Sequence, residues 1–542
     1  MRGNPMDSMP TLQTPGDNQR VEPTVQPQAG DANAAVAPRL QQQIVPRYFD
    51  VQGNRVIALE RIAPLLEPLA GRQMTVATLV GEVNKITALY QQEGYVLSFA
   101  LLQNQDFANG VVRVTIVEGH VDALRINGEA GNAAGRLHTL SEPLLAENPL
   151  TRATLERALG LMRQVPGTRI TPTLDMPKRA GGGTELVLDV SHTRVGVSAG
   201  IADMGTGMQG IVNLSTNSLT PLGEQIKLTA AIPTASGDVK YIAGSATVPL
   251  GSQGLAIEVD GYHYDAHPKD SVLQSQGWDR RVVNERLGLG LTYPLLLSNT
   301  SMVTASAGAY VGQSIDEYHR EADNAWLQQR THLRVLRAGL SVRNVTESQA
   351  RELSINVYKG LDAMGAKKSM TSNYANLDAP GYDLDFTRFT ADAKQTIQLP
   401  AKFGLTLSAT GQYTRNALPS MEQTSFGAWR YGLGYPQGEL AGDKGYGISA
   451  ELNRKFTTGW PLLTSLQPYI MVDHARAWYN ASNQVEHNGR KLSSAALGMR
   501  LTDDRYYVLD FNVAKPIGNL PLNRDDRRLR FNANYSLIYD GL

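Results

Sequence analysis

The spacing of apolar residues changes character twice along the chain. Residues 1–44 are rich in Pro, Gln, Asn and Ala and hold few apolar positions, so we expect a flexible segment without a core of its own. Between Tyr48 and Val190, apolar residues at helical spacing alternate with short strand-like runs. Beyond His192 the helical spacing disappears, and alternation with a period of two continues to the C-terminus. The pattern therefore predicts a mixed α+β region followed by a long all-β region.

The first part of the α+β region, residues 45–120, predicts a unit with the order β-α-α-β-β. A strand over 48–54 ends in a turn, and a short helix limited by prolines follows over 59–66. Thr75 is placed to cap a longer helix that ends at Gly94. The apolar face of that helix is formed by Val76, Leu79, Val80, Val83, Ile86 and Tyr90. Two strands complete the unit, and the second of them consists of Val111, Val112, Arg113, Val114, Thr115, Ile116 and Val117.

The same order of elements recurs in residues 121–192. The predicted elements are a strand over 124–127, a weak helix over 140–146, a helix that starts at Thr151, and strands over 170–174 and 185–190. Two units of similar length and order indicate an internal duplication. A pair of unrelated α+β units would produce the same pattern, so the pattern alone does not decide between these interpretations.

Residues 193–542 show two-residue alternation in many short segments. Representative apolar rows are Val195, Val197, Ala199 and Ile201; Leu405, Leu407 and Ala409; and Phe531, Ala533, Tyr535 and Leu537. A soluble β-sandwich would bury this apolar face, whereas a membrane barrel would turn it toward lipid. The long region without helical interruption favours a closed barrel, because sheet edges cannot stay unpaired in hydrocarbon. At ~10 residues per spanning strand, plus turns and loops, we expect about sixteen antiparallel strands.

The composition narrows the class of protein further. Lys+Arg and Asp+Glu both number 51, so no net charge points to nucleic acid or to an acidic membrane surface. The chain has no Cys, which removes disulfides, thiolate metal sites and cysteine nucleophiles. No apolar run approaches the ~18–20 residues that a spanning helix needs, so a helical membrane protein is excluded. We expect an exported protein, although no apolar signal-peptide core follows Met1.

Three motifs could indicate an enzyme, and each has a simpler interpretation. The Gly-Val-Ser-Ala-Gly run around Ser198 matches the hydrolase nucleophile elbow, but it lies in an alternating strand with no helix after it. His263 and His267 flank a carboxylate, yet Pro268 and the strand pattern favour a polar loop over a metal site. The Gly-rich run after Arg286 lacks the Lys-Ser/Thr pair of a phosphate loop. We therefore expect no catalytic residue, no metal and no cofactor.

Several separated motifs resemble those of two-partner secretion transporters, the haemolysin secretion/activation (TpsB) family. The segments that carry the resemblance to its two POTRA domains and its first barrel turn are 49–54, 90–95, 117–121, 161–167, 183–190 and 217–224. The resemblance covers nearly everything after residue 45. It implies a mainly β protein in which two α+β POTRA domains, over 45–120 and 121–192, precede a transmembrane antiparallel β-barrel over 193–542.

One barrel motif resembles the family's loop that folds back into the pore, and this loop is expected at about 422–446. The family usually has an aliphatic residue, then Arg, Gly and an aromatic residue. Here Trp429 precedes Arg430, and Tyr431 separates that arginine from Gly432. The motif continues with Gly434, Tyr435, Gly442 and Asp443.

A second barrel motif, residues 467–478, resembles the family's strand whose aspartate holds the arginine of the pore loop. Two-residue alternation places Tyr469, Met471, Asp473 and Ala475 on one face of this strand. Inside a barrel a carboxylate is tolerated when it is paired, and arginine can hold it through two charge-assisted hydrogen bonds. The resemblance therefore implies a latch between Arg430 and Asp473.

The resemblance implies transport of another protein without covalent chemistry. The POTRA pair would receive, in the periplasm, the unfolded N-terminal secretion domain of a large exoprotein such as an adhesin, a haemolysin or a contact-dependent toxin. Strand addition at a POTRA edge, assigned to Val111–Val117, would give affinity without demanding one sequence. The exoprotein would then pass through a monomeric barrel in outer-membrane lipid without ATP, and no nucleic acid is expected as a partner.

Two other functions fit parts of the pattern. A barrel-assembly insertase of the same superfamily would share the fold, although assembly factors commonly carry more than two POTRA domains. A passive porin with peptidoglycan-binding modules would share the barrel, but it would not need the pore-loop motif.

Overall fold

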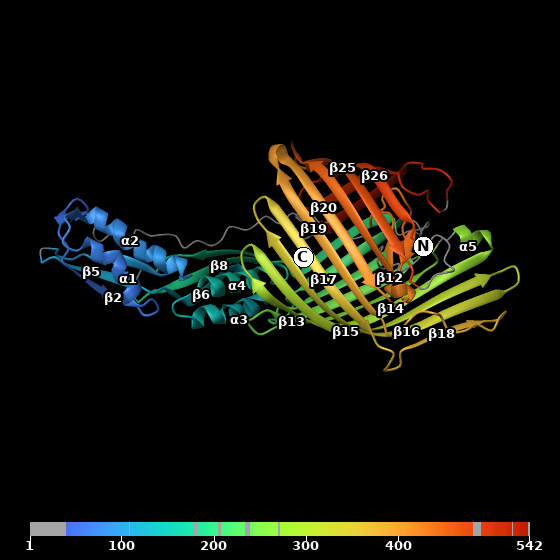
Figure 1. The fold of residues 1–542 in the computed structure, drawn as a ribbon, viewed down its shortest axis with the longest axis horizontal. Helices are drawn as coiled ribbons and strands as arrows, with labels where there is room; N and C mark the ends of the chain where they lie inside the picture. The colour runs from blue at the N-terminus through green and yellow to red at the C-terminus, as the bar shows by residue number, and fades with distance from the viewer. Residues whose placement is uncertain are drawn as a thin grey trace.

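The computed structural model describes residues 39–107, 109–177, 181–203, 208–232, 239–268, 271–480, 489–522 and 524–539. Two small α+β units follow one another along the long axis of the molecule, and a large barrel lies beyond them (Figure 1). Most of the predicted N-terminal segment 1–44, namely residues 1–38, lies outside the described residues. Within the described ranges, no helix is both long and apolar enough to cross a membrane.

The first α+β unit has the predicted order of elements. These are β1 (Gln43–Ile44), β2 (Tyr48–Gln52), α1 (Leu59–Leu66), the 3₁₀ turn η3 (Glu67–Leu69), β3 (Met74–Thr75), α2 (Val76–Gln92), β4 (Phe99–Leu102) and β5 (Val111–Val117). The main sheet has the order β2-β5-β4, with β2 parallel and β4 antiparallel to β5. A separate pair, β1 and β3, precedes helix α2.

Helix α2 begins and packs as its sequence predicts. The Thr75 hydroxyl accepts a hydrogen bond from the Thr78 amide at 3.2 Å, which satisfies one of the open amides at the helix N-terminus. The core of the unit receives the side chains of Val76, Leu79, Val83, Ile86 and Tyr90 from this helix. Helical spacing and an N-cap were therefore sufficient to predict both the start of α2 and its buried face.

A buried carboxylate, Glu118, organises the end of the first unit. It accepts hydrogen bonds from the Tyr90 hydroxyl at 3.0 Å and from the amides of Arg55 and Val56 at 2.7 and 2.9 Å. Burial raises the pKa of Tyr90, and the adjacent Glu118 carboxylate raises it further. The carboxylate thereby fixes the end of α2 against the turn that follows β2.

The prediction that Val111–Val117 forms an edge of the sheet is wrong. These residues form β5, the central strand, which pairs with β2 from Tyr48↔Val111 to Gln52↔Thr115 and with β4 from Phe99↔Val117 to Leu102↔Val114. Central pairing leaves few of its backbone groups available to another chain. The two edges of the sheet are β2 and β4.

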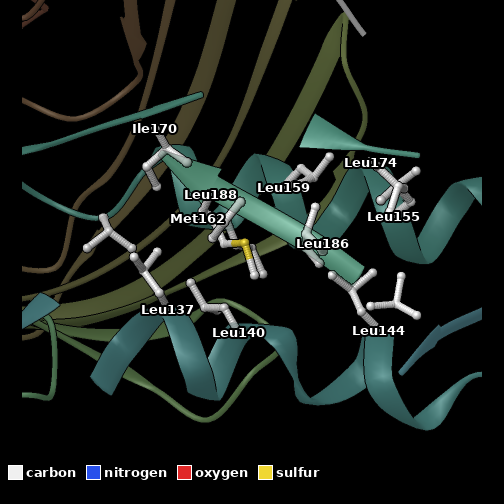
Figure 2. Close-up of a cluster of buried hydrophobic side chains, with 14 of the residues drawn as sticks. Leu137, Leu140, Leu144, Leu155, Leu159, Met162, Ile170, Leu174, Leu186 and Leu188 are labelled. Carbon is white, nitrogen blue, oxygen red and sulfur yellow. The ribbon is translucent and has the colours of Figure 1, made fainter. Parts of the chain in front are cut away.

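The second unit repeats the order of the first. Its elements are β6 (His120–Glu129), α3 (Ala133–Ala146), α4 (Arg152–Arg163), β7 (Thr168–Leu174) and β8 (Gly183–His192). The sheet order is β6-β8-β7, again with one parallel and one antiparallel pair. Figure 2 shows the core between the helices and the sheet, built from Leu137, Leu140, Leu144, Leu155, Leu159, Met162, Ile170, Leu174, Leu186 and Leu188. The repeated topology supports the predicted duplication.

The two α+β units are packed against each other at a tight junction. Leu97 follows helix α2 in the first unit, yet its fully buried side chain belongs to the core of the second unit. A Cβ atom on Gly119 would lie 2.3 Å from the Leu97 carbonyl oxygen, so only glycine permits this approach. The Arg152 amide at the start of α4 donates to the Gly94 carbonyl at 2.7 Å. The units therefore share core and backbone contacts.

The second unit docks on turns of the barrel through its helices. Arg157 of α4 donates from Nη2 to the carbonyls of Gln253 and Pro294 at 2.7 and 2.8 Å. Arg136 of α3 donates to the Gly251 carbonyl at 2.5 Å. Charged donors on backbone acceptors hold the barrel turns in place without requiring a particular side chain there.

The all-β region forms one closed barrel. Its strands are β9 (Val195–Asp203), β10 (Met208–Asn217), β11 (Gln225–Ile232), β12 (Val239–Leu250), β13 (Leu255–Ala266), β14 (Trp278–Leu297), β15 (Ser301–Arg320), β16 (Ala325–Val345), β17 (Gln349–Gly360), β18 (Lys367–Ser372), β19 (Thr387–Leu399), β20 (Phe403–Thr414), β23 (Lys444–Arg454), β24 (Phe456–Trp460), β25 (Leu463–Trp478), β26 (Lys491–Thr502), β27 (Tyr507–Pro516) and β28 (Arg530–Tyr539). Short helical pieces, α5 (Ser271–Ser275) and η4 (Pro400–Lys402), lie in its loops.

The barrel has sixteen strand positions, as predicted. β18 pairs with β16 beyond the end of β17, and β24 pairs with β25 beyond the end of β23, so each of these short strands continues its predecessor. β28 closes the barrel on β9 through five residue pairs, from Tyr535↔Ile201 to Tyr539↔Val197. All pairings in the barrel are antiparallel.

The two faces of the barrel wall differ as the alternation predicts. On β14 the outward side chains Leu287, Leu289 and Leu291 are exposed, whereas Arg280 and Asn284 on the inner face are buried. Apolar residues outside and polar residues inside are typical of a barrel in lipid.

The junction between the α+β units yields a stability prediction. Leu97→Ala leaves a cavity in the core of the second unit, and we expect it to destabilise that unit by about 2–5 kcal/mol. Hydrogen-exchange mass spectrometry on the full chain would show faster exchange in α3 and α4. Leu145→Ala, at a side chain on α3 that is 42% exposed, serves as the matched control. Unchanged exchange in Leu97→Ala would contradict the shared core.

Candidate functional site

The connection between β20 and β23 folds back into the barrel. It contains η5 (Ser420–Glu422), β21 (Thr424–Phe426) and β22 (Leu440–Gly442), and its residues from Asn416 to Asp443 are all buried or half-buried. The turns at 251–254 and 294–299 contact the α+β units, and the turn at 400–402 lies at the same end of the barrel. Strand β20 runs from that turn to the opposite end, where the loop begins and turns into the lumen. A loop of this length with no exposed residue must be enclosed by the barrel wall. We call it the pore loop; it overlaps the predicted range 422–446, whose last residues belong to β23.

The pore loop is a hairpin with a tight tip. β21 pairs with β22 from Thr424↔Gly442 to Phe426↔Leu440, and the tip is closed by bridges between Gly427 and Arg430 and between Ala428 and Gly432. Gly427 has a φ of 133°, and a Cβ atom there would lie 2.1 Å from the Pro436 carbonyl oxygen. Only glycine fits this position.

Both backbone polar groups of Leu433 take part in seating the tip. The Leu433 amide donates to Asp473 Oδ2 on β25 at 3.0 Å, and the Leu433 carbonyl accepts from Asn532 Nδ2 on β28 at 3.0 Å. Ser494 of β26 donates to the other carboxylate oxygen of Asp473 at 2.5 Å. Asn532 also donates to Asn512 Oδ1 on β27 at 2.8 Å. Four adjacent strands thus share the contacts that seat the tip.

The predicted ion pair between Arg430 and Asp473 is not formed in the structure. Among the described residues, the side-chain and backbone donors on the Asp473 carboxylate are Ser494 and Leu433, and Arg430 is not one of them. The Arg430 guanidinium instead lies 5.8 Å from the centre of the Phe426 ring. Asp473 faces the lumen beside Tyr469 and Ala475, as the alternation predicts. The predicted strand face is confirmed, but the group that it holds is a backbone amide.

The other residues of the pore-loop motif pack against the wall. The Tyr431 ring covers Gly447 on β23, where a Cβ atom would lie 2.6 Å from Tyr431 Cγ. Tyr435 donates from its hydroxyl to the Asn519 carbonyl at 2.8 Å. Three glycines permit close approach: Gly432 to Leu492, Gly434 to Pro516 and Gly442 to Trp478. Each of these glycines lies where a side chain would separate the loop from the wall.

Asp443 closes the base of the hairpin. Its Oδ1 accepts from the Leu418 amide at 3.0 Å, and its Oδ2 accepts from the Asn480 amide at 2.8 Å. One carboxylate therefore joins the incoming arm of the loop, the outgoing arm and the segment after β25. Every residue except proline has a backbone amide donor, so the roles of the Leu433 and Leu418 amides could not be identified from the sequence.

The residues considered for enzyme chemistry lie in ordinary strand contexts. Ser198 lies within β9, and its hydroxyl accepts from Asn213 Nδ2 on β10 at 3.1 Å. His263 Nδ1 lies 2.9 Å from Glu285 Oε1 on the neighbouring strand, while His267 follows the end of β13. The described part of the chain holds no group of three or more His, Cys, Asp or Glu residues arranged for a metal ion.

Known proteins share this arrangement. The family model of the ShlB-type POTRA domain matches residues 44–119, and that of the haemolysin secretion/activation protein ShlB/FhaC/HecB matches residues 182–501. The chain is 20% identical over 502 residues to the heme/hemopexin transporter protein HuxB of Haemophilus influenzae (strain 86-028NP), covering 90% of this chain and 85% of HuxB. It is 22% identical over 456 residues to the outer membrane transporter CdiB of Escherichia coli O6:K15:H31, covering 81% and 73% of the two chains. The solved structure of CdiB from Escherichia coli matches with a TM-score of 0.68 at 16% identity, over 98% of this chain and 100% of that one.

POTRA domains in front of a sixteen-strand barrel with an inserted loop are the architecture of POTRA-bearing outer-membrane β-barrel proteins. The family match spans more than half of the chain, and the chain belongs to the haemolysin secretion/activation protein family of ShlB, FhaC and HecB. Members of this family are outer-membrane transporters that secrete partner proteins.

The tip contacts predict how variants of the pore loop behave. Asp473→Ala leaves the buried Leu433 amide without an acceptor, which costs roughly 1–3 kcal/mol and favours a displaced tip about 5- to 150-fold. We expect a higher ion conductance of the purified protein in planar bilayers. Arg430→Ala leaves the hydrogen bonds between Leu433, Asp473 and Ser494 in place, so its conductance should change less. A larger increase in conductance for Arg430→Ala than for Asp473→Ala would show that Arg430 is the main residue that holds the loop.

Proposed function

We propose that this protein passes an unfolded exoprotein from the periplasm through its own barrel to the cell surface. The observation that carries the proposal is the pore loop, a hairpin that occupies the lumen and is seated at its tip by a few hydrogen bonds. A plug of this kind can be displaced without unfolding the wall. The barrel would lie in outer-membrane lipid as a monomeric pore, with both POTRA domains in the periplasm.

The proposed cargo is a large exoprotein of the adhesin, haemolysin or contact-dependent toxin type. Its N-terminal secretion domain would reach the POTRA domains unfolded. The relatives HuxB and CdiB are both named as transporters, which supports a transport role. Export would proceed without ATP, because folding of the emerging chain outside the cell would prevent its return.

We propose that cargo adds a strand to the β2 edge of the first POTRA domain. On the other edge, the Ala100 amide of β4 already donates to Thr87 Oγ1 on α2 at 3.0 Å, so part of that edge is satisfied by the helix. On the β2 side, Tyr48 and its register partner Val111 are 65% and 43% exposed. Backbone pairing gives affinity to many sequences, and exposed apolar side chains add to it.

The proposed function is tested by removing the first POTRA domain. Deletion of residues 45–119 removes the first POTRA domain and also takes Leu97 from the core of the second, so it should abolish secretion of the partner exoprotein while the barrel still inserts and other barrel proteins assemble normally. Secretion is measured in culture supernatant, and barrel folding by heat-modifiable mobility in gels. A general defect in barrel assembly would indicate an insertase instead. Undiminished secretion would rule out the receiving role.

The choice of edge has its own test. A photo-crosslinking residue at Gln52, on β2, should form adducts with cargo during export, whereas the same residue at Leu101, on β4, should not. Both sites lie on the same sheet, so the second serves as a control for general proximity. Adducts only at Leu101 would move the binding edge to β4.

A further inference from the structure

The pore loop has a second anchor, separate from the contacts at its tip. The turn η5 (Ser420–Glu422) leads from β20 into the hairpin, and the Glu422 side chain at its end is 3% exposed. The Glu422 carboxylate accepts a hydrogen bond from Tyr310 of β15 at 2.7 Å and lies 2.7 Å from Arg388 Nη2 of β19. One carboxylate therefore ties the root of the loop to two strands of the wall.

The neutral side chain of Gln412 extends this anchor to both arms of the hairpin. Arg388 donates from Nη1 to Gln412 Oε1 at 3.0 Å. Gln412 Nε2 donates in turn to the carbonyls of Glu422 and Asp443 at 2.9 and 3.0 Å. The Arg388 guanidinium also lies over the Tyr358 ring, 4.0 Å from its centre. The arginine is thus held from several sides in the position that pairs with Glu422.

Apolar side chains surround the charged pair. Leu418 and Met421 of the loop pack with Tyr382, Leu384 and Phe386, which lie between β18 and β19. This shielding lowers the local dielectric constant and strengthens the attraction between the two charges. Loss of one partner would leave the other charge buried and uncompensated, which is strongly destabilising.

We propose that Glu422 is a positioning residue for polypeptide transport. It fixes the root of the pore loop on β15 and β19, so that the hairpin beyond it, residues 424–442, is displaced while the root stays in place. The two anchors differ in kind, because the tip is seated by hydrogen bonds of the Leu433 backbone and the Tyr435 hydroxyl, whereas the root is held by a buried ion pair. The inference rests on the proposed transport function and specifies which part of the plug moves.

The absence of cysteine from the chain provides a direct probe of the root. A single Ala417→Cys substitution places a thiol beside the apolar cluster, and its reaction with a maleimide reports whether the root is seated. We expect Glu422→Ala to raise the labelling rate about tenfold or more, because a buried ion pair is broken. Glu422→Gln, which keeps an acceptor for Tyr310, should raise the rate less. Glu347→Ala, at an exposed turn residue, is the matched control and should leave the rate unchanged.

Planar-bilayer conductance of the same purified variants, without cargo, provides the second measurement. We expect higher conductance in Glu422→Ala and lower secretion in cells, with normal heat-modifiable mobility of the barrel. If Glu422→Ala does not fold, the same measurements are made on Tyr310→Phe. This variant removes the hydrogen bond from Tyr310 to Glu422 and should still raise the labelling rate. Labelling and conductance equal to the parent protein in both folded variants would overturn the proposal. Failure of the parent protein to secrete would instead refute the transport function, whatever the root variants show.

Discussion

Every backbone amide and carbonyl of a strand that crosses hydrocarbon must find its partner within the protein, and the rest of this structure follows from that requirement. It closes the sheet on itself, with β28 paired to β9. A closed barrel of sixteen positions leaves a lumen wider than its wall side chains can fill, as in porins. The pore loop occupies this space, and the wall provides hydrogen-bond partners for the Leu433 backbone and the Tyr435 hydroxyl. Closure follows from this constraint, and it creates the lumen in which the pore loop lies.

Local patterns were sufficient to predict the elements but not their neighbours. Helical spacing and Thr75 gave helix α2, and two-residue alternation gave the barrel strands with the correct face inward at Asp473. The order of strands in a sheet depends on pairing between distant segments, which alternation does not encode. Strand β5 shows this limit, because the same apolar pattern is expected for an edge strand and for a central strand. Its central position follows from pairing with β2 on one side and with β4 on the other.

The candidate site was predicted in its location and missed in its chemistry. The motif around Arg430 predicts a loop that folds into the pore; its residues are buried or half-buried, and Asp473 accepts a hydrogen bond from the Leu433 amide of that loop. The group that it holds is the Leu433 amide, and every residue except proline carries such a donor. Asn532 is one of several polar residues on the inner face of β28, and Glu422 lies in a loop, so no spacing distinguishes either of them. Their roles follow only from which strands the fold brings together.

The insertion of Leu97 into the neighbouring core has a mechanical consequence. Because the two POTRA units share that core and the second is tied to the barrel by Arg136 and Arg157, the span from the β2 edge to the barrel mouth is set by the protein. An extended chain covers at most roughly 3.3–3.6 Å per residue. A cargo held at β2 therefore needs a minimum length of unpaired chain before its next segment reaches the lumen. If cargo adds a strand at β2 as proposed, the rigid junction therefore sets the shortest tether that allows the cargo to reach the lumen.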